Sequence, residues 1–184
     1  MNTLERCPGC AATFPTVDGA THPYIGASAA CWALYSAVLA GGEPPPHLLA
    51  NSKVVPVKVT ASPSHPNANL LLVDAYAAQH HGDPSPQAIQ SVAVHLLVLH
   101  GVLSRMVAPE AALWIRRRAM RRKGVYAWLS PPPPEAAYAL RHCFPGPDIG
   151  PPQPIATYVG SVYMSWRELH GSQLDAWYDE FVAA

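Results

Sequence analysis

The stretch from Asn69 to Ser104 constrains the fold of this chain most, because it predicts two helices joined by a tight turn. Within the turn, Gly82 can end the first helix, and Ser85 and Pro86 provide an N-cap and a first-turn proline for the second. Side chains at helical spacing define one predicted face on each helix: Leu70, Val73, Ala77 and His80 on the first, and Ala88, Ser91, His95, Leu99 and Val102 on the second. A buried histidine without a partner costs roughly 1–3 kcal/mol, so His80 and His95 need partners.

Other segments also predict helices, and none shows the alternation expected of a strand. The predicted helices cover residues 26–41, 109–123 and 155–184, the last with a break at Gly171–Ser172. Residues 43–68 and 130–154 are rich in proline and are predicted to be long loops. We therefore expect an all-α fold over residues 1–184: a single-domain bundle of about five or six helices, with a Cys-x-x-Cys knuckle in residues 1–25 packed on it.

The charge composition gives little support to binding of nucleic acid or membranes. Only 13% of the residues are charged and the net charge is zero, so nothing global favours binding to nucleic acid or to an anionic membrane. Half of the basic residues lie in Arg116–Lys123, for which a solvated helix face is the first interpretation and an anion or nucleic-acid site the alternative. The chain shows neither a signal peptide nor an apolar run of the ~20 residues that span a bilayer, which predicts a cytoplasmic protein.

The sequence Cys7-Pro8-Gly9-Cys10 is typical of half of a zinc knuckle, since a turn between two cysteines lets both thiolates reach one ion. A redox role would call for a βαβ pattern around the motif, and this segment has none. A complete site needs two further ligands, and no second Cys-x-x-Cys follows. The candidates are Cys31, His80 and His95, whereas Cys143 lies in a proline- and glycine-rich stretch and is not expected to be a ligand.

Geometry limits which histidine can join. In an antiparallel helix pair, His80 and His95 lie roughly 10 Å apart along the pair, so both are not expected on one ion. The preferred set is Cys7, Cys10, Cys31 and His80, with Asp74 holding the imidazole of His95 through a hydrogen bond. The alternative set is Cys7, Cys10, His80 and His95, with Cys31 as a small core residue. Sulfur and imidazole ligands favour zinc over magnesium or calcium.

Several motifs occur in an order that resembles the bacterial domain-of-unknown-function family 5946. They are CPGC, HPYIGASAACWA, VDAYAAQHHG, SVAVHLLVL, WLSPP and the C-terminal VYMSWRELH with AWY. The most specific parts are the CxxC, the Cys31–Trp32 pair and the D-x-Y-x-x-Q-H pattern of Asp74, Tyr76, Gln79 and His80. His81 stands where the family commonly has proline. The resemblance supports which residues matter, but implies no activity.

Three function classes remain open. In the first, a closed four-ligand zinc site is structural, and the protein binds another protein or a small ligand, with the surface around Trp166 and Trp177 as a contact area. In the second, three ligands and a water make a metal-dependent hydrolase or thiol-transferase, with Asp74, His95 or Tyr76 as the base and a pocket lined by Asp74, Gln79 and His95. The third uses Arg116–Lys123 for anions or nucleic acid and predicts salt-sensitive binding. Gln79 and Ser91 complete the predicted surroundings of the site.

Overall fold

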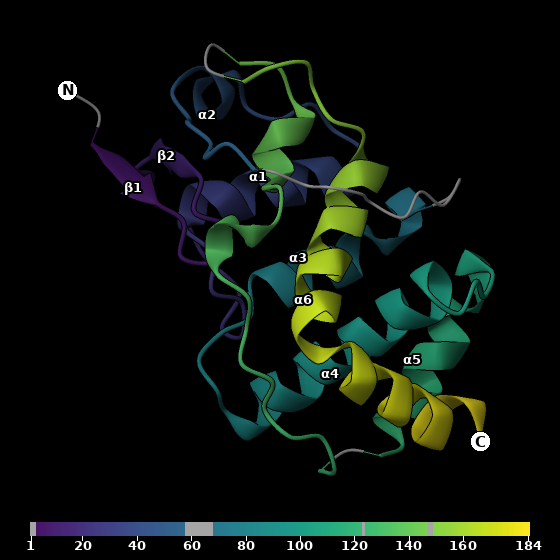
Figure 1. Ribbon diagram of the computed structural model, residues 1–184. Coiled ribbons are helices and arrows are strands. Elements are labelled where there is room, and N and C mark those ends of the chain that lie inside the picture. The colour runs from purple at the N-terminus through teal and green to yellow at the C-terminus, as the bar shows by residue number, and fades with distance from the viewer. Residues whose placement is uncertain (1–2, 58–67, 123, 147–148) are drawn as a thin grey trace.

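The protein is mostly helical, as expected, with one small sheet at the N-terminus (Figure 1). The computed structural model describes residues 3–57, 68–122, 124–146 and 149–184. The α-helices are α1 (Ala29–Leu39), α2 (Pro46–Ala50), α3 (Leu72–Gln79), α4 (Pro86–Leu103), α5 (Ala112–Met120) and α6 (Ile155–Tyr178). The 3-10 helices are η1 (Ala68–Leu71), η2 (Pro109–Ala111), η3 (Pro134–Ala136) and η4 (Leu140–Cys143), and a π-helical turn, η5 (Asp179–Ala183), ends the chain.

The predicted helix pair is confirmed, with α4 at the centre of the bundle. The Ser85 hydroxyl accepts a hydrogen bond from the backbone N–H of Ala88 at 3.1 Å, and Pro86 occupies the first turn, as the sequence predicts. Helix α4 packs against α3, α5 and α6. By length and composition α4 is apolar enough to cross a membrane, but 67% of it is buried inside the protein, as in the core helix of a soluble fold.

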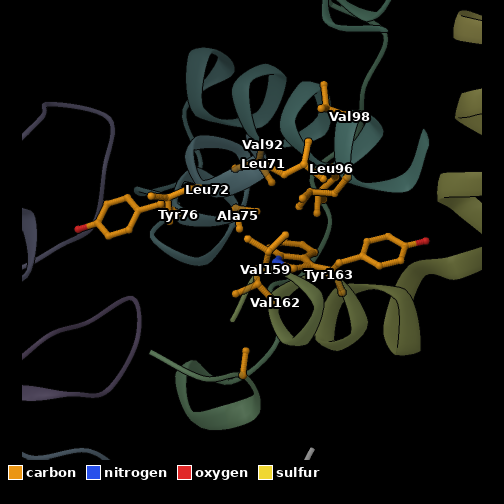
Figure 2. Packing of buried hydrophobic residues seen from close by; sticks show 14 of the residues in the cluster. Leu71, Leu72, Ala75, Tyr76, Val92, Leu96, Val98, Val159, Val162 and Tyr163 are labelled. Carbon is orange, nitrogen blue, oxygen red and sulfur yellow. The ribbon is translucent and has the colours of Figure 1, made fainter. Parts of the chain in front are cut away.

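The core lies between α3, α4 and α6. Figure 2 shows Ala75 of α3 and Leu96 of α4 pointing toward Val159 and Val162 of α6. The Tyr76 ring points the other way, out of this cluster and toward the N-terminal part of the chain. Helix α3 thus contributes one face to the bundle core and another to the region around the cysteines.

Two details of the predicted pattern are wrong. Leu70 and Val73 were expected on the buried face of their helix, yet they are 59% and 37% exposed, because η1 precedes α3 and its tighter winding rotates the following face. The second is that no strand was predicted, yet β1 (Leu4–Arg6) pairs antiparallel with β2 (Thr13–Pro15). The break expected at Gly171–Ser172 is present one residue earlier, as a kink at His170 that joins two helical segments of α6.

A buried arginine, Arg141, connects the two proline-rich segments. The Arg141 guanidinium donates hydrogen bonds to the Ser52 hydroxyl, to the Leu49 carbonyl at 2.6 Å and to the Phe144 carbonyl at 2.7 Å. The two expected loops, 43–68 and 130–154, therefore contain α2, η3 and η4 and are tied together by one side chain. Part of the first loop, residues 58–67, lies outside the described residues.

The buried side chain of His100 should make the free energy of unfolding sensitive to acid. Burial lowers its pKa to about 4, and the neutral ring accepts a hydrogen bond from Arg105 at 3.2 Å while its other nitrogen contacts the Tyr163 hydroxyl at 3.0 Å. The unfolded chain binds a proton near pH 6.5, so the stability contributed by neutral His100 is present above about 6.5 and is lost as the pH falls toward about 4. We expect the free energy of urea unfolding of wild type to approach that of His100→Gln over this range. A difference that is constant with pH would contradict this assignment.

Candidate metal centre

The first two cysteines lie at the tip of the N-terminal hairpin. Cys7 directly follows β1, and its backbone N–H donates to the Ala12 carbonyl at 2.8 Å, while Ala11 donates to the Cys7 carbonyl at 3.0 Å. Ala11 closes the turn in the left-handed region, with a φ of 59°. Both thiols are buried, although the strands that carry them are only three residues long. The CxxC segment therefore adopts a knuckle whose two sulfurs face the interior.

The third and fourth donors come from helix ends. Cys31 lies in the first turn of α1, where the Ser28 hydroxyl accepts a hydrogen bond from its backbone N–H at 3.3 Å. His80 is the C-cap of α3, and its carbonyl accepts a hydrogen bond from the Gly26 N–H at 2.7 Å. The donor atoms of Cys7, Cys10, Cys31 and His80 all lie within 4.8 Å of one another, and all four residues are buried. These four residues, hereafter the metal centre, are positioned to hold a metal ion.

The His80 ring is held with one nitrogen aimed at the sulfurs. Its Nδ1 lies 3.0 Å from the Tyr76 carbonyl, which can only accept, so Nδ1 carries the proton and Nε2 presents its lone pair. Nε2 lies 3.4 Å from the sulfur of Cys31. The Tyr76 ring stacks on the imidazole with centroids 3.9 Å apart, and its hydroxyl donates to the Cys31 sulfur at 3.5 Å. A carbonyl that orients a histidine from behind is the usual support of a metal-ligating imidazole.

The three sulfurs do not titrate independently. Hydrogen bonds from Cys10 and Cys31 hold the pKa of Cys7 far below its ordinary value, even though burial opposes this. Hydrogen bonds with Cys10 and Cys7, together with burial, raise the pKa of Cys31. For Cys10 the hydrogen bond with Cys31 lowers the pKa, but the contact with Cys7 and burial outweigh it. One thiolate surrounded by two thiols is the expected protonation state of such a cluster before a cation replaces the protons.

Close backbone contacts hold the knuckle against the end of α3. A Cβ atom added at Gly9 would lie 2.5 Å from Cδ2 of His80 and 2.9 Å from the Gly26 carbonyl. Residues 22–26, hereafter the strap, also run past the end of α3, where Ile25 and His81 form an isolated antiparallel β-bridge. Glycine at position 9 is therefore required by the approach of the knuckle to the histidine ring.

Of the two ligand sets left open by the sequence, the structure brings together the one with Cys31. His95 is not part of the metal centre; its Nδ1 lies 2.7 Å from an oxygen of Asp74, the partner that the sequence analysis assigned to it. The same oxygen accepts a hydrogen bond from Nη2 of Arg116 at 2.6 Å. Sequence reasoning missed Arg116 because it was grouped with the solvated arginines. The only sequence signal for a buried role of Arg116 was its position in a predicted helix that is partly apolar. In the structure this helix, α5, packs on α4.

The remaining predicted residues have separate roles. Gln79 does not join Asp74 and His95; its amide donates to the Tyr138 carbonyl at 2.8 Å and accepts from the Tyr158 hydroxyl at 3.0 Å, which links α3 to α6. Ser91 lies one turn before His95 and lines the same pocket. Trp166 and Trp177, expected to offer a contact surface, are instead buried in the core.

The basic cluster is only partly a solvated face. Besides Arg116, the guanidinium of Arg118 lies 5.4 Å from the centre of the Trp114 ring, and that of Arg122 lies 5.9 Å from the centre of the Phe181 ring. Arg117 is exposed, and Lys123 lies outside the described residues.

A pocket of about 450 Å³ lies beside the metal centre and is lined by Tyr76, whose hydroxyl donates to the sulfur of Cys31. Its remaining walls come from the strap, α1, α3 and α4: His22, Tyr24, Ile25, Trp32, Tyr35, Val73, Ala77, Gln87, Ser91 and His95. A smaller pocket of about 120 Å³, lined by Arg116, shares Gln87, Ser91 and His95 with it. Asp74, His95 and Arg116 are joined by hydrogen bonds and are hereafter called the Asp74 triad. His95 lies at the boundary of the two pockets, and Arg116 lines the smaller one.

The metal centre, the Asp74 triad and the helical core define a helical domain with a Cys₃His cluster. The chain belongs to the family of unknown function DUF5946, whose model matches residues 58–166. The matched region includes His80 and the Asp74 triad, while the three cysteines of the metal centre precede it. No curated protein and no solved structure matches the chain.

Gly9→Ala tests the close approach of the knuckle to His80. We expect at least a tenfold loss in metal affinity, because the added methyl group pushes the knuckle from His80 without removing a ligand, measured by competition with a chromophoric chelator. Gly19→Ala is the matched control, since its Cβ would meet only the Cβ of Ala29 at 3.8 Å. Equal affinities for the two variants would show that the approach to His80 is not needed for binding.

Proposed function

We propose that this protein is a zinc-stapled helical binding protein, in which zinc is structural and the adjoining pocket receives a small ligand. The observation that carries the proposal is the buried set of three sulfurs and one oriented imidazole. Four protein ligands make a closed tetrahedral shell, which is typical of structural zinc, whereas catalytic zinc keeps an open position for water. The sulfur-rich donors favour zinc over magnesium or calcium.

Donor spacing supports a tetrahedral ion of this size. Zinc bonds of about 2.3 Å to sulfur and 2.0–2.1 Å to nitrogen place two sulfurs about 3.8 Å apart, and a sulfur and a nitrogen about 3.6 Å apart. The sulfurs of Cys10 and Cys31 are 3.9 Å apart, and Cys31 lies 3.4 Å from Nε2 of His80. A disulfide would need about 2.05 Å, and all the cysteines are free. Free thiols agree with a reducing compartment, and we propose that the protein is cytoplasmic.

Zinc would attach the N-terminal hairpin to the helical bundle. A two-stranded hairpin with three-residue strands is not stable by itself, and its main buried groups are the two cysteines and Phe14. Binding of zinc by Cys7 and Cys10 on one side, and by Cys31 and His80 on the other, converts metal affinity into folding free energy for this segment.

The enzyme alternative has less support. A metal-bound water needs a vacant ligand position, and the four donors already fill a tetrahedral shell. The Asp74–His95 pair is a possible base, but in the described part of the chain its two side chains contact each other and Arg116, and neither contacts a residue of the metal centre.

Metal content decides the ligand set. We expect about one zinc per chain in protein purified without chelator, by elemental analysis, because the four donors are preassembled. His80→Ala and Cys31→Ser should lose most of this zinc, while the matched controls His95→Ala and Cys143→Ser should retain it. Zinc-free wild-type protein would overturn the proposal, and zinc loss in His95→Ala with retention in Cys31→Ser would favour the other ligand set.

Metal removal separates a structural from a catalytic role. After chelation we expect faster amide hydrogen exchange in residues 3–31 and around His80, with little change in α4 and the first half of α6, since zinc holds the former and core packing the latter. In cobalt-substituted protein, azide or cyanide should leave the visible spectrum unchanged, because a closed shell offers no free position. A spectral change on adding either anion would indicate an open, catalytic type of site.

A further inference from the structure

Aromatic side chains that contact one another in series line one wall of the pocket beside the metal centre. The rings of Tyr35 and Tyr76 stack with centroids 3.8 Å apart, Trp32 lies 5.3 Å from Tyr35, and His22 lies 5.8 Å from both Trp32 and Tyr24. All five side chains line the pocket. Aromatic walls bury and orient flat rings through stacked and edge contacts. The volume of about 450 Å³ falls in the range of small-molecule sites, roughly 300–1,000 Å³.

The opposite end of the pocket is polar. Gln87, Ser91 and His95 line both this pocket and the smaller one, so a ligand on the aromatic wall can reach the boundary between them. Nδ1 of His95 is engaged by Asp74, and its Nε2 has no hydrogen-bond partner among the described residues. Arg116 lines the smaller pocket and gives one donor to Asp74, which leaves further N–H groups of its guanidinium for a ligand.

The charged side chains at the polar end of the pocket disfavour a cationic ligand. Asp74 is 2% exposed and lines neither pocket, and the donors of Arg116 and His95 both occupy one of its oxygens. Arg116, whose side chain is 32% exposed, is the one Lys, Arg, Asp or Glu residue that lines either pocket in the described part of the chain. A ligand therefore meets a guanidinium and an imidazole, but no accessible carboxylate. Carboxylates are the usual partners of such donors.

We infer that this pocket binds a small planar aromatic carboxylate, with its ring against Trp32 and the edges of the stacked Tyr35 and Tyr76 rings and its carboxylate between His95 and Arg116. The inference rests on the proposed function, because the metal centre fixes the wall: Tyr76 stacks on His80 and donates to the sulfur of Cys31. It adds the chemical class of the ligand, which the metal centre alone does not specify.

Three probes of one shape and different charge test the ligand class. They are 2-naphthoate, the neutral 2-naphthalenemethanol and the cationic 2-naphthylmethylammonium ion, each titrated into zinc-loaded protein by calorimetry or equilibrium dialysis. We expect 2-naphthoate to bind at least tenfold more tightly than either of the others, because the aromatic wall is common to all three and the guanidinium favours only the anion.

Two variants and a matched control locate the binding. Ser91→Phe should abolish binding of all three probes, since Ser91 lines both pockets and a ring there fills them. Arg116→Gln should weaken 2-naphthoate at least tenfold and leave the alcohol within about twofold. Arg117→Gln makes the same change at the exposed neighbouring position and should alter neither. Zinc content and the thermal midpoint are measured on each sample, so that loss of binding is compared only among folded, metal-loaded proteins.

The outcomes distinguish this inference from the proposed function. Failure of 2-naphthoate to bind zinc-loaded wild type overturns the inference and leaves the zinc staple intact. Equal or tighter binding of the alcohol or the ammonium ion also overturns it, as does a folded Arg116→Gln variant with unchanged affinity. Absence of zinc from wild type instead overturns the proposed function itself.

Discussion

Convergence of three buried sulfurs and one imidazole at a single point is the constraint on which the N-terminal half of this structure depends. The hairpin β1–β2, the first turn of α1 and the C-cap of α3 meet there, over a sequence separation of more than 70 residues. Three thiols packed together with a histidine in an apolar interior are unfavourable unless their polar atoms are satisfied. A cation bound by the four donors would satisfy all of them at once, and it would also hold a hairpin too short to persist alone.

Tyr76 extends the effect of this centre to the pocket. Its carbonyl orients the His80 ring, its hydroxyl donates to Cys31 and its ring stacks between His80 and Tyr35. Desolvation and the neighbouring sulfur raise the pKa of its hydroxyl, so the phenol stays protonated and remains a donor. Tyr76 therefore links the metal centre to the aromatic wall of the pocket.

Local sequence patterns predicted the helices and the preferred set of four residues that converge at the metal centre, and the geometry of the helix pair predicted the contact between Asp74 and His95, but other long-range contacts were not predicted. Ser85 and Pro86 specify the start of α4 by contacts within three residues. The two-residue spacing of Cys7 and Cys10 indicates a pair of metal ligands. The strands of the hairpin are too short to show alternation. The pairing of Arg116 with Asp74 joins residues 42 positions apart, and Arg141 links the proline-rich loops through the Ser52 hydroxyl and through backbone carbonyls that have no sequence signature.

The family model covers only part of the residues that form the metal centre and the pocket. The family match begins at residue 58, so it contains the Asp74 triad, α4 and the Tyr76 side of the pocket, but none of the cysteines of the metal centre. Arg116 and His95 on one carboxylate oxygen keep a nearly inaccessible Asp74 paired, a requirement that comes from the helical core and not from any metal. The polar end of the pocket is thus built by the bundle itself, whereas most of its aromatic wall comes from the strap and from α1. The ligand site proposed above therefore draws on both parts of the chain, with the bundle supplying the charge and the N-terminal segment supplying most of the rings.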